Sequence, residues 1–179
     1  QFNAANPDLQ LEARYAWINV AGWNIYYYLA VDGLSILLVL LTSFLTPISI
    51  LSTWKAVDDR VKDFMIFFLL LEVGMMGVFL AQDLFMFYVF WEFTLVPMYF
   101  LIGVWGGKRR IYAAIKFVLY TAFGSLLMLV AIAYLAWTSS VQFGHWSFYL
   151  GDWMRLSFSY KEQLWLFGAF ALAFAIKVP

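Results

Sequence analysis

The sequence predicts an all-α protein, a polytopic bundle of transmembrane helices. Of its 179 residues, 65% are hydrophobic and only 12% are charged, whereas a soluble globular domain has about 25% charged residues. The mean hydropathy is +0.81, and only four of the charged residues fall within five long apolar runs. Because a bilayer core needs about 20 apolar residues in a helix, these runs exclude a soluble globule and indicate membrane spans.

Residues 1–32 are expected to form a loop on the outer side of the membrane. This segment holds a single basic residue, Arg14. It also holds aromatic residues of the kind that gather at membrane interfaces: Trp17, Trp23, Tyr26, Tyr27 and Tyr28. The chain begins with Gln1 and lacks the basic first region of a signal peptide, so we expect the sequence to be a fragment of a longer protein.

Five spans are predicted from the apolar runs, and with their connections they occupy residues 33–179. Asp32 and Asp83 directly precede the first and third runs, where an aspartate favours the start of a helix by capping its N-terminus. The last run stops at Pro179 and is shorter than a complete span, so we expect it to be truncated. The spans are expected near residues 33–54, 64–81, 84–105, 111–137 and 163–179.

Lysine and arginine residues predict the orientation of these spans. Connections 55–63 and 106–110 each hold three of them, whereas connection 82–83 holds none. Since basic connections stay on the cytoplasmic side of a membrane, residues 55–63 and 106–110 are expected there. Residues 138–162 and the N-terminal segment are expected on the opposite side.

The composition also argues against several kinds of chemistry. The chain has no cysteine and one histidine, so we expect no disulfide, no metal centre and no redox cofactor on this chain. Its net charge is zero, and it shows no glycine-rich nucleotide-binding motif. We therefore expect it to bind neither nucleic acid nor nucleotides.

Two glutamates lie deep inside predicted spans. Glu92 is near the middle of the span 84–105, where an ionised carboxylate costs about 2.5–3.5 kcal/mol on insertion scales. Two interpretations are open: a carboxyl that joins two helices, or a carboxylate on a proton or ion pathway, which we favour. Glu72 is similarly deep, and Gly74 and Gly77 after it allow a neighbouring helix to approach closely. A structural and a pathway role both stay open for Glu72.

Two lysines also lie inside apolar runs. Lys177 is followed by Val178 and Pro179, and because a proline removes a helix donor, the helix is expected to bend or break there. Broken membrane helices form ion sites in transporters; the other interpretation is an ordinary flanking lysine at a helix end. Lys116 lies near the start of its span, where it either extends to the cytoplasmic interface or takes a buried role.

The third span and the turn after it hold further candidates. Pro97 is expected to kink the span, since it leaves the carbonyl of Phe93 without its helical donor. Lys108, Arg109 and Arg110 follow two glycines and either bind an anionic lipid headgroup or serve only as a topogenic turn. The aromatic residues of this span are interpreted as packing and lipid contacts rather than a cofactor site: Phe85, Phe87, Tyr88, Phe90, Trp91 and Phe93.

Several stretches of the sequence closely resemble one family of membrane proteins. They include FWEFTLVPMYFLIGVWGG (residues 90–107), KRRIYAAIKFVLYTAFGSLLML (108–129) and ALAFAIKVP (171–179). These stretches resemble the antiporter-like subunit M of bacterial proton-pumping NADH:quinone oxidoreductase, respiratory complex I, which corresponds to mitochondrial subunit 4. DGLSILLVLLT (32–42) and GVFLAQDLF (77–85) fit the same family.

The resemblance implies a fragment of a 14-helix antiporter-like subunit that moves protons through buried residues. Glu92 matches the family's channel glutamate and Lys177 the lysine of its broken helix, while Glu72 and Lys116 match ionisable residues of its fourth and sixth helices. Quinone reduction elsewhere in the complex would drive transport, while NADH, flavin, iron–sulfur clusters and quinone would bind other subunits. The implied partners are the other membrane subunits of complex I and the lipid bilayer, and the implied location is the bacterial inner membrane.

Two other functions stay open at this point. A subunit of a multisubunit cation/proton antiporter or of a membrane-bound hydrogenase would share the fold and the glutamate and lysine motif. A helical scaffold without transport would use the buried charges only as structural pairs. Replacement of Glu92 distinguishes a scaffold from a transporter, and the subunits that copurify distinguish complex I from its relatives.

Overall fold

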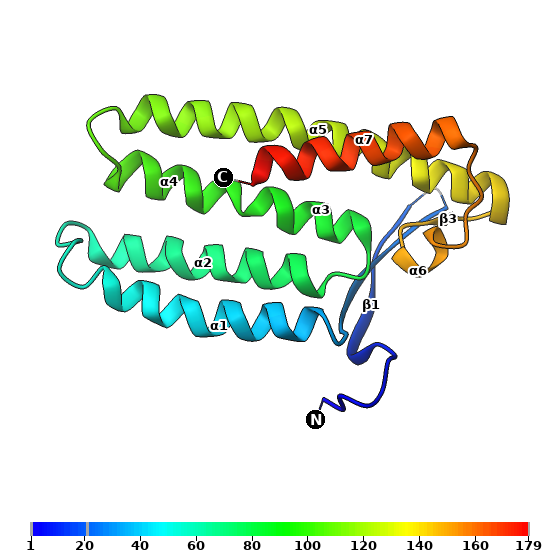
Figure 1. Cartoon of the computed structure of the whole chain (residues 1–179), viewed down its shortest axis with the longest axis horizontal. Helices are drawn as coiled ribbons and strands as arrows, with labels where there is room; N and C mark the ends of the chain where they lie inside the picture. The colour runs from blue at the N-terminus through cyan, green and yellow to red at the C-terminus, as the bar shows by residue number, and fades with distance from the viewer. Residues whose placement is uncertain (1, 21, 179) are drawn as a thin grey trace.

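The computed structural model describes residues 2–20 and 22–178, and this part of the chain is mostly helical. The long helices lie lengthwise beside one another, and a small sheet lies at one end of the bundle (Figure 1). In chain order the elements are β1 (Gln10–Val20), β2 (Trp23–Val31), α1 (Ser35–Ser52), α2 (Val61–Leu80), α3 (Leu84–Phe93), α4 (Leu95–Trp105), α5 (Arg110–Phe143), β3 (Trp146–Ser147), α6 (Leu150–Trp153) and α7 (Tyr160–Lys177).

Four helical segments in the described part of the chain are long and apolar enough to cross a membrane. They are Ser35–Ser52, Val61–Leu80, Leu84–Trp105 and Arg110–Phe143, and they correspond to the first four predicted spans. The segment that was expected near 163–179 forms α7, whose 18 residues include Lys161, Glu162 and Lys177. Length and composition therefore support a multi-pass membrane protein.

Two helix ends differ from the predicted boundaries for local reasons. α5 continues past residue 137 to Phe143 and stops at Gly144, whose φ is 77°, a left-handed conformation that glycine adopts without strain. α7 begins at Tyr160, ahead of the expected start, because Ser159 and Glu162 form a reciprocal capping box. Such a box supplies hydrogen-bond acceptors to the free N–H groups at a helix N-terminus.

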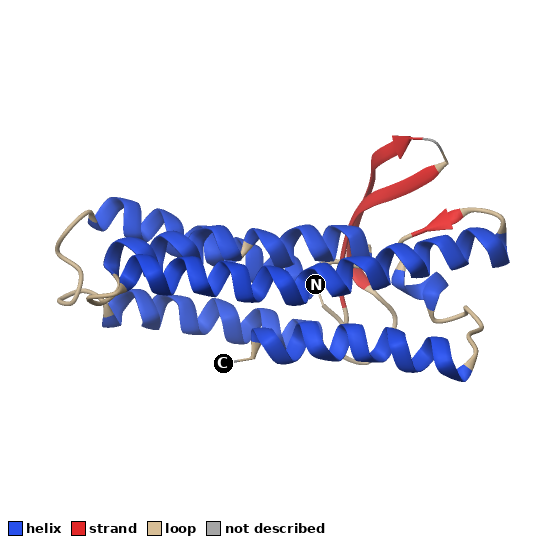
Figure 2. Ribbon diagram, turned by 90° about the horizontal axis from the view of Figure 1, so that it is seen from above, coloured by secondary structure: helices blue, strands red, loops and turns tan. Residues whose placement is uncertain are grey.

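Much of the segment 1–32 is a β-hairpin, so the expectation of a loop is wrong there. β1 and β2 pair antiparallel, with Val20 opposite Trp23, and β3 extends the sheet in parallel. Aromatic and β-branched residues favour strands, and Ile25 of β2 is buried with Met128 and Ile132 of α5. Figure 2 shows the hairpin projecting from the helical layer. Aromatic residues that indicated a membrane interface thus belong to paired strands.

Asp83 fixes the hairpin to the end of the bundle. Its side chain is 1% exposed and accepts hydrogen bonds from the backbone N–H groups of Tyr26 at 3.1 Å, Phe85 at 3.0 Å and Met86 at 3.1 Å. The predicted cap of α3 is therefore confirmed, and the same carboxylate also holds β2. Asp32 likewise accepts from the N–H of Ser35 at 2.7 Å, which holds the pKa of its carboxyl below the ordinary value.

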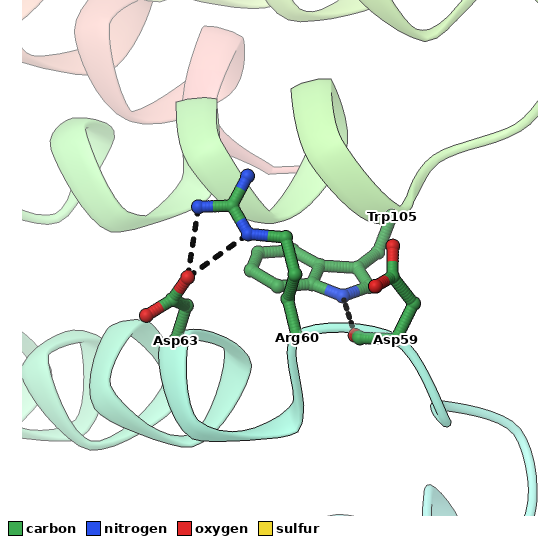
Figure 3. A network of polar contacts seen from close by, with 4 residues as sticks. All are labelled: Asp59, Arg60, Asp63 and Trp105. Carbon is green, nitrogen blue, oxygen red and sulfur yellow. Dashed lines mark hydrogen bonds and ion pairs between the residues drawn. The ribbon is translucent and has the colours of Figure 1, made fainter.

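The two basic connections lie together at the opposite end of the bundle. The indole N–H of Trp105 donates to the carbonyl oxygen of Asp59 at 2.9 Å, and Arg60 forms an ion pair with Asp63 at 2.8 Å. Figure 3 shows these four residues at the joint between the α1–α2 connection and the end of α4. The structure thus places both basic connections at one end, as the charge pattern predicted.

Candidate functional site

The third span is interrupted beside Glu92, which is half-buried. α3 ends at Phe93 and α4 begins at Leu95, with Thr94 between them. The hydrogen bond from Met98 N to Thr94 O is long, at 3.4 Å. Pro97 lies one turn further on and has no N–H to donate to the carbonyl of Phe93. Thr94 keeps a helical backbone, with φ of −61° and ψ of −22°, so the interruption is local and leaves the carbonyl of Phe93 without its helical donor.

Lys177 reaches this interruption from α7. Its Nζ donates to the carbonyl oxygen of Trp91 at 3.2 Å and to Thr94 Oγ1 at 2.8 Å. Thr94 Oγ1 itself donates to the same Trp91 carbonyl at 2.8 Å. The ammonium also lies 4.4 Å from the centre of the Trp91 ring, within the range of a cation–π contact. The ammonium of Lys177, the hydroxyl of Thr94 and the carbonyl of Trp91 are thus all in contact with one another.

α7 ends at the residue that makes these contacts. Lys177 is the last helical residue, and Val178 is extended, with φ of −68° and ψ of 127°. A residue that precedes proline favours this extended conformation. Pro179, which the sequence predicted to break the helix, lies outside the described residues.

Glu92 lies one residue after Trp91 and has a buried oxygen without a partner. In the described part of the chain, its Oε1 makes no hydrogen bond, and the only ion pair is the one between Arg60 and Asp63. Leaving a buried polar atom unsatisfied is costly. The structure therefore holds the ammonium of Lys177 on neutral groups beside Glu92 rather than on its carboxylate.

Small residues bring the surrounding helices close to this group. A Cβ on Gly74 of α2 would lie 2.8 Å from the methyl carbon of Thr94, and a Cβ on Gly124 of α5 would lie 2.7 Å from Ile176 Cδ1. Both contacts are closer than real Cβ atoms show, so a side chain at either position would have to displace its neighbour. The close approach that the sequence predicted after Glu72 is confirmed at Gly74.

A cleft of about 600 Å³ opens beside the docked lysine. Its lining comes from α2, α3, α4, α5 and α7, and most of it is apolar. The polar groups in the lining are Thr94, Tyr120, Thr121 and Lys177. The cleft thus gives the lysine side chain room on one side.

Among the described residues, the other predicted site residues make no hydrogen bond or ion pair with this group. Glu72 is half-buried in α2, and within the described residues no hydrogen bond or ion pair joins it to Glu92 or Lys177. Lys116 is exposed on α5, with its ammonium 5.9 Å from the Tyr112 ring, which fits the interface interpretation better than the buried one.

The basic turn is also separate. Lys108 and Arg109 are exposed, and Arg110 donates to the carbonyl of Val104 at the end of α4. Arg109 shares a surface groove of about 450 Å³ with Lys116.

The sequence did not point to Thr94 or Trp91 as site residues. The sequence pattern places Trp91 among aromatic residues that pack, and it gives Thr94 no role. The available signal was a hydroxyl residue three positions before a proline inside an apolar span, since such a side chain can satisfy the backbone groups that a proline frees.

These features define a multi-pass membrane protein that holds ionisable side chains at an interrupted helix. Residues 81–179 match the family described as the NADH:quinone oxidoreductase/Mrp antiporter transmembrane family. The match covers more than half of the sequence, and the chain belongs to this family.

Curated relatives confirm the resemblance to subunit M. NADH-quinone oxidoreductase subunit M of Rhodobacter capsulatus is 46% identical over 187 residues, a match that covers 99% of this chain and 35% of the relative. Subunit M of Rickettsia conorii is 43% identical, over 100% of this chain and 35% of the relative. NAD(P)H-quinone oxidoreductase chain 4 1 of Microcystis aeruginosa is 40% identical, over 99% of this chain and 32% of the relative. The chain thus spans about a third of the length of these relatives.

Solved structures show the same fold. A chain of respiratory complex I from Thermus thermophilus is 35% identical and superposes with a TM-score of 0.75 over 93% of this chain and 34% of that one. A chain of the archaeal membrane-bound sulfane sulfur reductase has a TM-score of 0.67 over 94% of this chain and 26% of that one. Its identity is 24%, so this second likeness concerns the fold alone.

Proposed function

We propose that the chain is the proton-translocating part of an antiporter-like subunit of NADH-quinone oxidoreductase, with Glu92 and Lys177 on the proton pathway. The observation that carries the proposal is the ammonium of Lys177 bound to Thr94 and to the carbonyl of Trp91, the residue before Glu92, whose buried Oε1 has no hydrogen-bond partner among the described residues. The names of the relatives support the assignment to this complex. The other membrane subunits would be its partners, and the bacterial inner membrane its location.

The proposed mechanism uses two arrangements of this pair. A buried charge is costly alone, whereas a glutamate and a lysine together compensate each other's charge. When the lysine joins Glu92, it takes up and keeps a proton. When it leaves for a neutral position, its affinity for the proton falls, and the ammonium gives up that proton once water in the pathway reaches it. Quinone reduction on other subunits would drive the exchange, and NADH, flavin and iron–sulfur clusters would also reside there.

Substitutions in the full-length subunit of the assembled complex test this proposal. We expect Lys177→Ala to abolish formation of the pH gradient in membrane vesicles, Glu92→Gln nearly to abolish it, and Glu92→Asp to retain part of it because the charge survives. Lys161→Ala is the matched control, since Lys161 is an exposed lysine on the same helix. Wild-type gradient formation by Lys177→Ala would leave a structural scaffold as the correct function.

A second candidate is a subunit of another antiporter-type complex, such as a cation/proton antiporter or a membrane-bound hydrogenase. The family description includes Mrp antiporters, and the fold occurs in a second archaeal respiratory membrane complex. Purification of the full-length subunit with its partners decides between them. Copurifying NADH-oxidising activity supports the first assignment, and its absence from an intact complex supports the second.

A further inference from the structure

Thr94 makes the shorter of the two hydrogen bonds to Lys177, yet the mechanism above gives it no part. We propose that Thr94, together with the backbone and ring of Trp91, forms a docking position that holds Lys177 away from Glu92 between transport steps. Thr94 is then a positioning residue for the lysine. This inference rests on the proposed function of Lys177 in proton transport.

The hydroxyl group suits a lysine that changes its protonation state. An ammonium has three donors and no acceptor, whereas a threonine hydroxyl both donates and accepts. In the structure Thr94 Oγ1 accepts from the ammonium while it donates to the carbonyl of Trp91. If the lysine loses its proton, the same hydroxyl turns its hydrogen toward the amine nitrogen. The docking position therefore holds both forms of the side chain.

The docking position also compensates the ammonium without a carboxylate. The carbonyl of Trp91 accepts one hydrogen bond, Thr94 accepts another, and the indole face lies 4.4 Å away. Buried charges need such compensation. Because these groups are neutral, Glu92 remains a competing partner for the same lysine. The ammonium of Lys177 thus has a position among neutral groups, at Trp91 and Thr94, that differs from a position on the carboxylate of Glu92.

Packing confines the exchange to the lysine side chain. Ile176 packs closely against Gly124 of α5, which places the end of α7 beside the site. The cleft next to Lys177 leaves space on the other side, and a lysine has a flexible four-carbon stem. We infer that the lysine side chain changes partners while the helix stays in place.

Thr94 has a second contact that provides a matched pair of variants. Its methyl carbon faces Gly74 of α2, while its hydroxyl faces Lys177. Thr94→Val removes the hydroxyl and keeps a methyl group toward Gly74, whereas Thr94→Ser keeps the hydroxyl and removes the methyl group. A docking role and a packing role thus predict opposite results for the two variants.

The experiment measures the pH gradient formed per quinone reduced in vesicles that contain the complete complex, with the amount of assembled subunit measured in parallel. We expect Thr94→Val to lower this ratio about tenfold or more, because it removes a hydrogen bond to a charged group. We expect Thr94→Ser to stay close to the wild type at equal assembly.

The other outcomes overturn the docking position. Wild-type pumping by Thr94→Val shows that the hydroxyl is dispensable, and a defect in Thr94→Ser equal to or greater than that in Thr94→Val shows that Thr94 acts through its contact with Gly74. Lys177→Ala distinguishes a failure of the docking position from a failure of the proposed function. If Lys177→Ala abolishes pumping while Thr94→Val does not, only the docking position is wrong; if Lys177→Ala pumps normally, the proposed function fails as well.

Discussion

Gly77 of α2 lies against the ring of Phe90 of α3, so closely that a Cβ on Gly77 would come within 2.2 Å of the ring carbons. One helical turn earlier, Gly74 faces the methyl group of Thr94. α2 thereby supports the interrupted helix along the turn that carries Trp91 and Glu92. The position of the docked lysine depends on this close contact between helices.

We expect Gly77→Ala to destabilise the subunit by about 1–3 kcal/mol, because overpacking a close contact displaces the neighbouring ring. The melting temperature of the purified complex measures the effect. Gly168→Ala is the control, since no atom lies within 4 Å of a Cβ built on Gly168. Equal melting temperatures for the two variants would contradict the packing argument.

The arrangement of the basic connections predicts the sidedness of labelling. The chain has no cysteine, so single cysteines introduced into it are read without interference from its own residues. Cysteines at Asp59 and Lys108 should react with an impermeant reagent from the same side of the membrane, and a cysteine at His145 should react from the other. Labelling of Asp59 and Lys108 from opposite sides would refute the topology.

Asp83 links pH to the anchoring of the hairpin. Burial raises the pKa of the Asp83 carboxyl above its ordinary value, although hydrogen bonds from Tyr26, Met86 and Phe85 oppose the rise. The folded state therefore binds the proton of Asp83 more tightly than the unfolded state does. The stability that comes from this protonation is fully present below the pKa of Asp83 in the unfolded state, and it is lost as pH rises through the pKa in the folded state.

We expect hydrogen-exchange protection of the Tyr26 amide, corrected for the intrinsic rate, to fall over this pH range. Asp83→Asn should remove the dependence on pH and lower the protection, because an amide has one acceptor oxygen where the carboxylate has two. Asp8→Asn, at an exposed aspartate, should leave the wild-type profile. An unchanged profile in Asp83→Asn would assign the effect to another group.

Glu72 should matter less for transport than Glu92. It is half-buried and, among the described residues, makes no hydrogen bond or ion pair with Lys177, and water can replace a secondary carboxyl on a pathway. We expect Glu72→Gln to slow gradient formation less than Glu92→Gln in the same vesicles. An equal or greater loss at Glu72 would reverse the order of importance of the two glutamates.

The basic end of α5 is the expected contact for an anionic lipid headgroup. Arg109 and Lys116 face one groove together with Tyr112 and Tyr120, and basic groups at a membrane surface attract anionic lipids by about 1 kcal/mol each. We expect Arg109→Ala with Lys116→Ala to reduce the phosphatidylglycerol retained by the purified complex. Lys161→Ala is the control, and retention equal to wild type in the double variant would show that the turn is only topogenic.

The sequence by itself determined the membrane-spanning character of the chain, the positions of the first four spans and the end at which the basic connections lie. These features depend on local composition, because a long apolar run has few alternatives to a helix in a bilayer. Helix caps such as Asp83 could be predicted for the same reason, since a capping side chain satisfies N–H groups only two or three residues away. The family motifs around Glu92 and Lys177 also lie within short stretches of sequence.

Tertiary structure decided the hairpin and the contacts of Lys177. The position of the hairpin on the bundle depends on Asp83, whose carboxylate accepts from the N–H of Tyr26, 57 residues earlier in the chain, and no local pattern records this contact. Likewise Lys177 reaches Thr94 across 83 residues, because Gly74 and Gly124 bring α2, α4, α5 and α7 together. Which neutral groups compensate a buried charge depends on how helices pack, and therefore only the folded chain revealed Thr94.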